Sequence, residues 1–226
     1  MKNVIFGNYD AYRDWDLIRT GMTIGTPEIK TEYVEIEGAD GEIDLTEYFG
    51  KINYKNRPLS FEFATAKRQD EFTELFSQIQ NAIHGKRMLV RPSDELDFYY
   101  MGRVKVNEWK SDKVIGRIVI DVNADPYKYK NNPTTVSKVL NGTERVSCYN
   151  LRKEVVPEIT ISGAATIVFR TYAMDGTLEK EHRFTVTSAT YPYTFTRPEI
   201  LFKEGENILE VTMNGAVIIK YQEGAL

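Results

Sequence analysis

The chain has almost none of the residues that build disulfides, zinc sites or histidine-based catalytic centres. Its 226 residues include one cysteine, Cys148, and two histidines, His84 and His182. A single cysteine excludes an internal disulfide and any metal site with several cysteine ligands. Two histidines leave little material for a zinc centre. We therefore expect no metal and no cofactor, and the composition favours a protein that is not an enzyme.

The chain also lacks a basic excess and a long hydrophobic run. Lys and Arg number 29 against 33 Asp and Glu, with net charges of −5 over residues 1–126 and +1 over 127–226. Nucleic-acid binding depends on neutralising phosphates, so no nucleic-acid partner is expected. No apolar run approaches the ~20 residues that span a bilayer, and the N-terminus is too polar for a signal peptide. These features predict a soluble protein made in a cytoplasm.

Alternating strands and one helix dominate the first half. Residues 33–37 and 42–45 alternate apolar and acidic side chains around Gly38-Ala39-Asp40-Gly41, which predicts a hairpin with a half-buried face. From residue 67 to 84, apolar residues recur every three or four positions, which predicts a long helix packed on a sheet. Further strands are expected at 59–63, 87–90, 98–101, 104–108 and 114–122.

The second half shows short strands separated by turns, with no helical stripe. Prolines, asparagines and a change of charge balance at 123–133 predict a domain boundary. Asp175-Gly176 and Asn214-Gly215 each lie between apolar runs, such as 208–213 and 216–221, which predicts hairpins there. Evenly spaced short strands favour a β-sandwich or jelly roll. The expected fold is thus mainly β, with an α+β domain over 1–127 and a C-terminal β-sandwich over 128–226.

Few residues have the type and the sequence position expected of catalytic groups. The acidic groups Asp94, Glu95 and Asp97, or Glu204 and Glu206, could in principle serve glycoside hydrolysis, but exposed turn residues explain them better. Cys148 shares a strand face with Val146, so a small buried residue is favoured over a nucleophile paired with His182.

Aromatic residues offer an alternative binding function. Tyr191 and Tyr193 lie in a tyrosine-rich run, and rings on a β-sandwich can stack on sugars or fill its core. For Tyr193 and Phe195, two positions apart on one strand face, a place in the core is the favoured interpretation. The alternative function is therefore a carbohydrate-binding module for host-surface glycans.

The strongest charge feature is an acidic segment. Eight acidic residues stand between positions 28 and 47 against the single Lys30. A basic region follows, comprising Lys51, Lys55, Arg57, Lys67, Arg68, Lys86, Arg87 and Arg91. This pattern fits a contact between neighbouring copies and equally a solvated edge protected by charge.

Several segments form a distinctive series along the chain, namely Phe6-Gly7, Trp15, Pro27 to Lys30, Val34 to Thr46, Tyr54 to Phe61 and Asp125 to Tyr129. The most diagnostic piece is the glycine-acid-glycine hairpin followed by Asn56-Arg57-Pro58-Leu59. Together these segments resemble the distal tail proteins of long-tailed, non-contractile bacteriophages, and the resemblance is best over residues 1–130.

The resemblance implies a structural virion protein of a phage or prophage, assembled in the bacterial cytoplasm and located at the tail tip. Members form a hexameric ring that joins the tail tube to the baseplate, with a tail-associated hub protein and receptor-binding proteins as partners. Their C-terminal domain is a galectin-like or carbohydrate-module-like sandwich. Here that domain has no room for a glycan-binding insertion, which argues against direct sugar binding.

Applied to this sequence, the resemblance puts the hairpin at or near a subunit interface. The candidate interface residues are Glu35, Glu37, Asp40, Gly41, Asp44 and Arg57. A ring needs two different patches that meet, and the acidic hairpin and the basic region around Arg57 are the candidates.

Overall fold

The computed structural model describes residues 2–38, 40–48, 50–67, 69–111, 115–172 and 176–226. The fold is mainly β, and the chain forms two compact units, one up to Lys128 and one from Tyr129 to Ala225. Each unit has its own hydrophobic core. No helix in the described ranges is long and apolar enough to cross a membrane.

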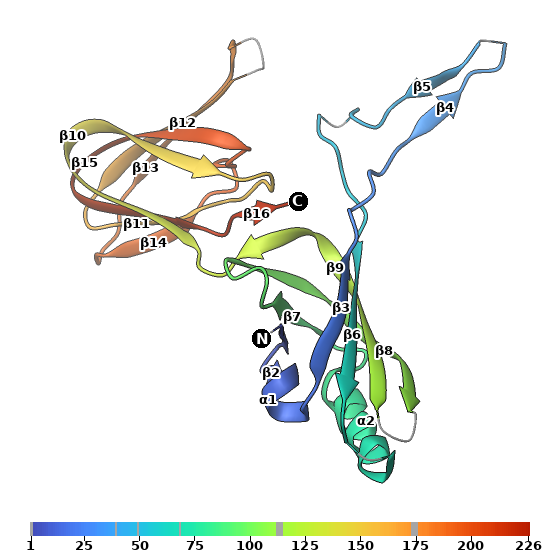
Figure 1. Ribbon diagram of the computed structural model, residues 1–226. Helices are drawn as coiled ribbons and strands as arrows, with labels where there is room; N and C mark the ends of the chain where they lie inside the picture. Colours follow the sequence, from blue (N-terminus) through green and yellow to red (C-terminus); the bar gives the residue numbers. More distant parts are fainter. Residues whose placement is uncertain (1, 39, 49, 68, 112–114, 173–175) are drawn as a thin grey trace. The chain divides into compact units, whose positions relative to one another are not determined.

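The first unit is built on one antiparallel sheet with the strand order β2-β1-β7-β8-β9-β6-β3 (Figure 1). Strand β6 shows why the sequence folds this way, because its alternate residues from Arg57 to Thr65 are buried and period two places them on one face. The strands are β1 (Val4–Phe6), β2 (Tyr9–Asp10), β3 (Ile18–Ile24), β6 (Arg57–Thr65), β7 (Arg87–Pro92), β8 (Phe98–Ser111) and β9 (Gly116–Lys130).

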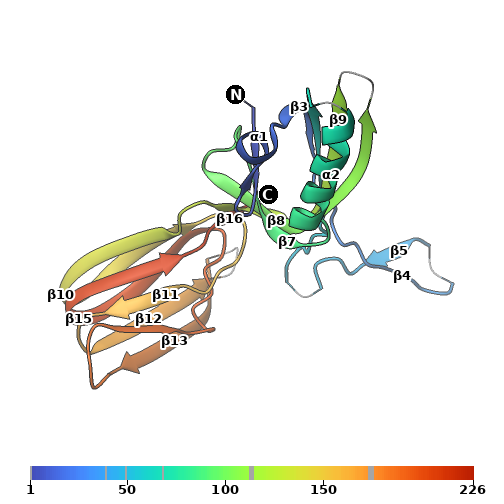
Figure 2. The ribbon, with the colours of Figure 1, turned by 90° about the horizontal axis from the view of Figure 1, so that it is seen from below.

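Two helices accompany this sheet. The short α1 (Ala11–Trp15) begins at Asp10, whose side chain accepts hydrogen bonds from the N–H groups of Tyr12 and Arg13, a regular N-cap. The helix expected over 67–84 is α2 (Gln69–Ile83), which is shorter, at 15 residues. Figure 2 shows α2 lying across the sheet.

Helix α2 packs on the sheet through a buried stripe, Phe72, Leu75, Ile79 and Ile83. A Cβ atom on Gly116 of β9 would lie 2.5 Å from the Phe72 ring. Only glycine therefore lets the helix approach the strand this closely.

The segment 123–133, expected to be a domain boundary, is strand and not loop for most of its length. Strand β9 continues to Lys130, and Ala124 pairs with Arg57 of β6. Pairing with a neighbouring strand outweighs the turn-forming composition of this segment. For the same reason the two strands expected at 98–101 and 104–108 are the single strand β8.

The second unit contains one curled sheet with the order β13-β12-β15-β11-β14, and β10 also pairs with β15. Strand β15 pairs with β12 through its first half and with β11 through its second. Leu209 and Ile219, from the two halves, belong to the same core, so the sheet closes on itself. The strands of this sheet are β10 (Thr134–Asn150), β11 (Glu158–Ile161), β12 (Ala165–Tyr172), β13 (Leu178–Val186), β14 (Tyr193–Thr196) and β15 (Gly205–Tyr221). The short strand β16 (Gly224–Ala225) pairs instead with β9.

The hairpin expected at Asn214-Gly215 is wrong. Strand β15 runs through these residues and stays paired with β10 along its whole length. Gly215 has a φ of 137°, and the Asn214 side chain accepts a hydrogen bond from the Gly142 N–H. Asn214 and Gly215 therefore allow the sheet to curl, and the chain does not reverse its direction there.

The other hairpin, expected at Asp175-Gly176, falls between β12 and β13 in the sequence. These strands pair in antiparallel register from Ala165↔Val186 to Tyr172↔Leu178. Residues 173–175, which include Asp175, lie outside the described residues.

Candidate interaction surface

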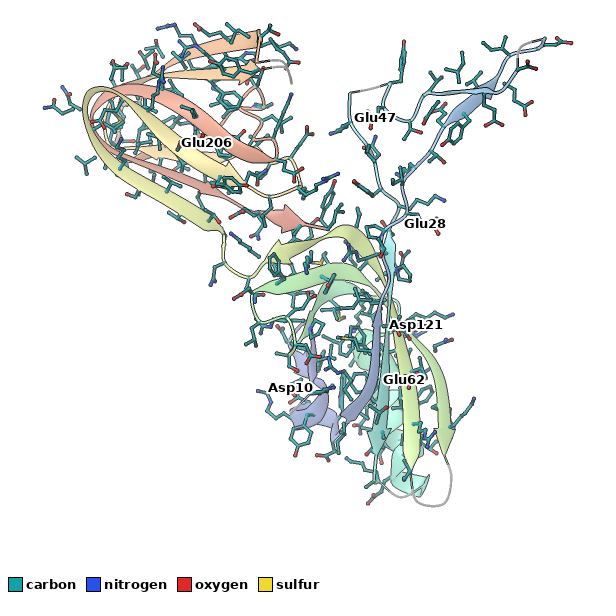
Figure 3. The ribbon with its side chains drawn as sticks, turned by 45° about the horizontal axis from the view of Figure 1, so that its top comes forward. Asp10, Glu28, Glu47, Glu62, Asp121 and Glu206 are labelled. Atoms are coloured by element: carbon teal, nitrogen blue, oxygen red, sulfur yellow. The ribbon has the colours of Figure 1, made fainter. Side chains whose placement is uncertain are left out.

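A long β-hairpin extension, here called the arm (residues 26–56), connects β3 to β6. Backbone hydrogen bonds continue the pairing of these strands into the arm, from Gly25 N–H to Pro58 O (2.8 Å), from Lys55 N–H to Glu28 O (2.7 Å) and from Lys30 N–H to Asn53 O (2.8 Å). Figure 3 shows Glu28 on the outgoing segment of the arm and Glu47 on the returning one. The arm is therefore a paired extension of the sheet.

The end of the arm is the hairpin expected from the sequence, formed by β4 (Tyr33–Glu35) and β5 (Glu42–Asp44). Gly38 and Gly41 have φ values of 84° and 80°, which are accessible to glycine at little cost. Ala39 lies outside the described residues. Among the described strands, β4 and β5 pair only with each other.

One face of this hairpin is apolar and exposed. Val34 pairs directly with Ile43, and Ile36 is two positions from Val34 on the same strand face. Their exposures are 41% for Val34, 49% for Ile36 and 47% for Ile43. The described residues thus leave the expected half-buried face uncovered, and an exposed apolar cluster of this kind is a candidate interaction site.

The other face is acidic. Glu35 lies directly opposite Glu42, and Tyr33 lies opposite Asp44. Hydrogen bonds from the Thr46 hydroxyl and backbone N–H lower the pKa of Asp44, so this carboxylate stays charged at neutral pH. Two carboxylates opposite each other repel, and a cation from outside the hairpin would relieve that repulsion.

The remaining hairpin candidates also lie at this end of the arm. Glu37 is exposed beside the turn, and Asp40 and Gly41 are exposed within it. The structure therefore brings together five of the six candidate interface residues.

Arg57, the sixth, lies elsewhere. Only 4% of it is exposed, and its guanidinium carbon is 5.7 Å from the centroid of the Tyr100 ring. It is held within the first unit and offers no surface charge. Sequence alternation could have indicated this, because Arg57 shares its strand face with the buried Leu59 and Phe61.

The two candidate exposed aromatics lie in the second unit. Tyr191 and Tyr193 are both about one-third exposed. Tyr193 stacks on Phe195 with ring centroids 5.9 Å apart, and both line a recess of about 370 Å³. Phe195 packs against the core, whereas Tyr193 stays at the surface, so the core interpretation fits only Phe195.

Three of the acidic residues considered for catalysis, Asp94, Glu95 and Glu204, have structural partners. Asp94 forms a 2.6 Å ion pair with the buried Arg19, and Glu95 accepts a hydrogen bond from the Tyr100 hydroxyl at 2.8 Å. Glu204 pairs with Arg152. No group of three potential metal ligands occurs in the part of the chain that the structure describes.

The single thiol, that of Cys148, also has a structural role, because it is packed in the core of the second unit. Cys148 is fully buried, and burial raises its pKa to about 12. The thiolate, which is the nucleophilic form, is therefore scarce at neutral pH. His182 stacks against Phe184.

Replacing Asp94 with Asn should destabilise the first unit, because it leaves the buried Arg19 without its counter-charge. The hydrogen bond from Arg19 lowers the pKa of Asp94. Because the pKa of Asp94 is lower in the folded chain than in the unfolded chain, its carboxylate stabilises the fold at pH values above the unfolded pKa of ~3.9. This stabilisation is lost as the pH falls through the pKa of the folded chain. Chemical denaturation between pH 7 and pH 3 should show a loss for the variant at pH 7 that shrinks towards pH 3. A constant loss across this range would contradict the ion-pair explanation.

One comparison with known proteins is informative. The fold is similar over 100% of both chains, with a TM-score of 0.72 and 15% sequence identity, to the crystal structure of the SPP1 Dit (gp 19.1) protein. That protein is described as a paradigm of the hub adsorption apparatus in phages that infect Gram-positive bacteria. No protein-family model matches the sequence, and the search of curated proteins gives no match.

Proposed function

We propose that the chain is a structural protein of a phage or prophage tail tip. It forms a ring of six copies that joins the tail tube to the baseplate and recruits receptor-binding proteins. The observation that supports this proposal most strongly is the fold similarity to the SPP1 hub protein over the full length of both chains. In this proposal residues 1–127 form the ring, residues 128–226 form the outer domain, and the particle assembles in the cytoplasm of the bacterial host.

The arm supplies a contact suited to a ring. Closed rings use heterologous interfaces, in which one patch meets a different patch on the next copy. The end of the arm combines exposed aliphatic side chains with a run of carboxylates, and the part of the chain that the structure describes leaves both faces exposed. Burying the aliphatic face provides affinity, and the carboxylates set the orientation and the partner.

Reversing the charges of Glu35, Asp40 and Asp44 to Lys should weaken this assembly. The loss should be largest at low ionic strength, because salt screens the attraction in the unmodified chain. Light scattering over a series of protein and salt concentrations measures the effect.

A matched control reverses three exposed glutamates of the second unit, Glu158, Glu179 and Glu199. This control changes the net charge equally but leaves the arm intact, so it should assemble as the unmodified chain does. Assembly of the arm variant that is unchanged at every salt concentration would contradict the role of the acidic hairpin.

A further inference from the structure

We propose that the second unit binds an extended segment of another protein, which lies as an additional strand between the edge strands β13 and β14. The inference goes beyond the proposed function, because it concerns the second unit alone and does not require the ring. Its basis is a pair of unpaired strand edges, the absence of protecting charges on them and an exposed cation beside them.

The recess of about 370 Å³ in the second unit lies between two strand edges. In the part of the chain that the structure describes, β13 pairs only with β12, and β14 pairs only with β11. Each strand therefore has backbone N–H and C=O groups without a strand partner on its free side. The lining comes from the end of β13 (Thr185, Val186 and Thr187) and from β14 and the residue after it (Tyr193, Phe195, Thr196 and Arg197).

The two edges are near enough to share one added strand. Arg197 reaches from the end of β14 to Phe184 of β13, and its guanidinium carbon is 5.5 Å from the centroid of the Phe184 ring. Opposed β-layers lie ~10 Å apart, and neighbouring strands lie ~4.8 Å apart. One extended segment between two opposed edges therefore has the normal strand spacing to each of them.

The edges lack the protection that edge strands usually carry. Charged side chains on an edge discourage pairing with another chain, and four of the five residues at 179–183 of β13 are charged. Residues 184–187, which reach the recess, are Phe-Thr-Val-Thr, and β14 is Tyr-Thr-Phe-Thr. Threonine, valine and aromatic residues favour strands, so the uncharged segments at the recess are suited to accept one.

The surroundings of the recess define the chemistry of the occupant. Val186 belongs to the hydrophobic core and Phe195 packs against it, so the inward side chains of the added strand should be aliphatic. Thr185 and Arg197 are exposed, so its outward side chains should be polar. Among the described residues Arg197 contacts the Phe184 ring and no carboxylate. An acidic side chain on the occupant would supply this missing counter-charge.

A labelled peptide tests the pairing of the backbone. The probe is the fluorescein-labelled peptide Val-Thr-Val-Glu-Val-Thr-Val, and its fluorescence anisotropy should rise and saturate as the unmodified chain is added. Methylating the backbone nitrogens of its valines removes the donors on one side of the strand, and methylating those of Thr and Glu removes the donors on the other. Each modification should weaken binding at least about tenfold, because several hydrogen bonds are lost.

A charge swap tests the acidic contact. The variant Arg197→Glu should bind the peptide at least about tenfold more weakly, because it brings like charges together. Replacing the Glu of the peptide with Lys should restore binding to this variant. The matched control is Lys180→Glu, which reverses an exposed cation of β13 outside the lining of the recess and should bind the original peptide as the unmodified chain does.

Hydrogen exchange of the unmodified chain locates the bound peptide. The peptide should protect the backbone amides of residues 184–187 and 193–196, and protection confined to other segments would overturn the inference, as would the absence of saturable binding. A loss caused by only one of the two methylated peptides would show addition to a single edge and contradict the position between two. Protection of both edges by rising chain concentration, without peptide binding, would identify a second copy as the occupant. A chain that binds the peptide but stays monomeric at every concentration would contradict the ring alone.

Discussion

Replacing Phe72 with Ala is expected to lower the free energy of unfolding of the first unit by about 3–5 kcal/mol, the usual cost of deleting a buried phenyl ring. Phe72 is fully buried, and its ring centroid lies 5.1 Å from that of Trp109. It also fills the space above Gly116. Alanine would leave a cavity between α2 and β9, and a loss of this size is a large part of the ~5–15 kcal/mol that stabilises a typical domain.

Tryptophan fluorescence during chemical denaturation measures this effect selectively. The two tryptophans, Trp15 and Trp109, both lie in the first unit, so their signal reports on that unit alone. The matched control is Phe76→Ala, because Phe76 also contacts Trp109 but is only half-buried. Equal losses for the two variants would contradict the packing described for α2.

Replacing Ile43 with Asp is expected to abolish assembly at micromolar concentration and to leave the folding of the first unit nearly unchanged. Burying a whole isoleucine side chain contributes ~1.5–3 kcal/mol, and Ile43 is 47% exposed in the single chain, so about half of this free energy remains to be gained on assembly. Because tenfold in affinity corresponds to ~1.4 kcal/mol, losing it weakens each contact by about 3- to 10-fold. Burying the new carboxylate at the contact adds a further and larger desolvation cost. Ile43 is outside the core of the unit, so unfolding should change little.

Light scattering gives the mass of the variant, and tryptophan fluorescence gives its stability. The matched control is Ile218→Asp on β15, which replaces an isoleucine of similar exposure in the second unit. If the Ile43 variant assembles as well as this control, the aliphatic face of the arm is not an interface.

The sequence predicts elements whose signals are local. The hairpin at the end of the arm follows from two glycines with positive φ between alternating segments, and α2 follows from the spacing of Phe72, Leu75 and Ile79. The two glycines fix the turn, and the helical period fixes the buried stripe, before any tertiary contact is known.

The sequence does not predict features that depend on contacts between residues far apart along the chain. Alternation shows that Val34 and Ile43 share one face, but it does not show that the described residues leave this face exposed. Asn214-Gly215 has the composition of a hairpin turn, yet pairing with β10 keeps β15 continuous. Arg57 counts as a surface cation in a charge tally, although it lies on the buried face of β6.

The proposed function requires this chain to close into a ring. Native mass spectrometry of the purified chain over a range of concentrations, with negative-stain images of the largest species, tests it most directly. A ring of six copies predicts a species of six times the 26.0 kDa chain mass. This species should appear as a closed ring in the images and should be lost in the Ile43→Asp variant. A mass of one chain at every concentration, with no ring in any image, would contradict it.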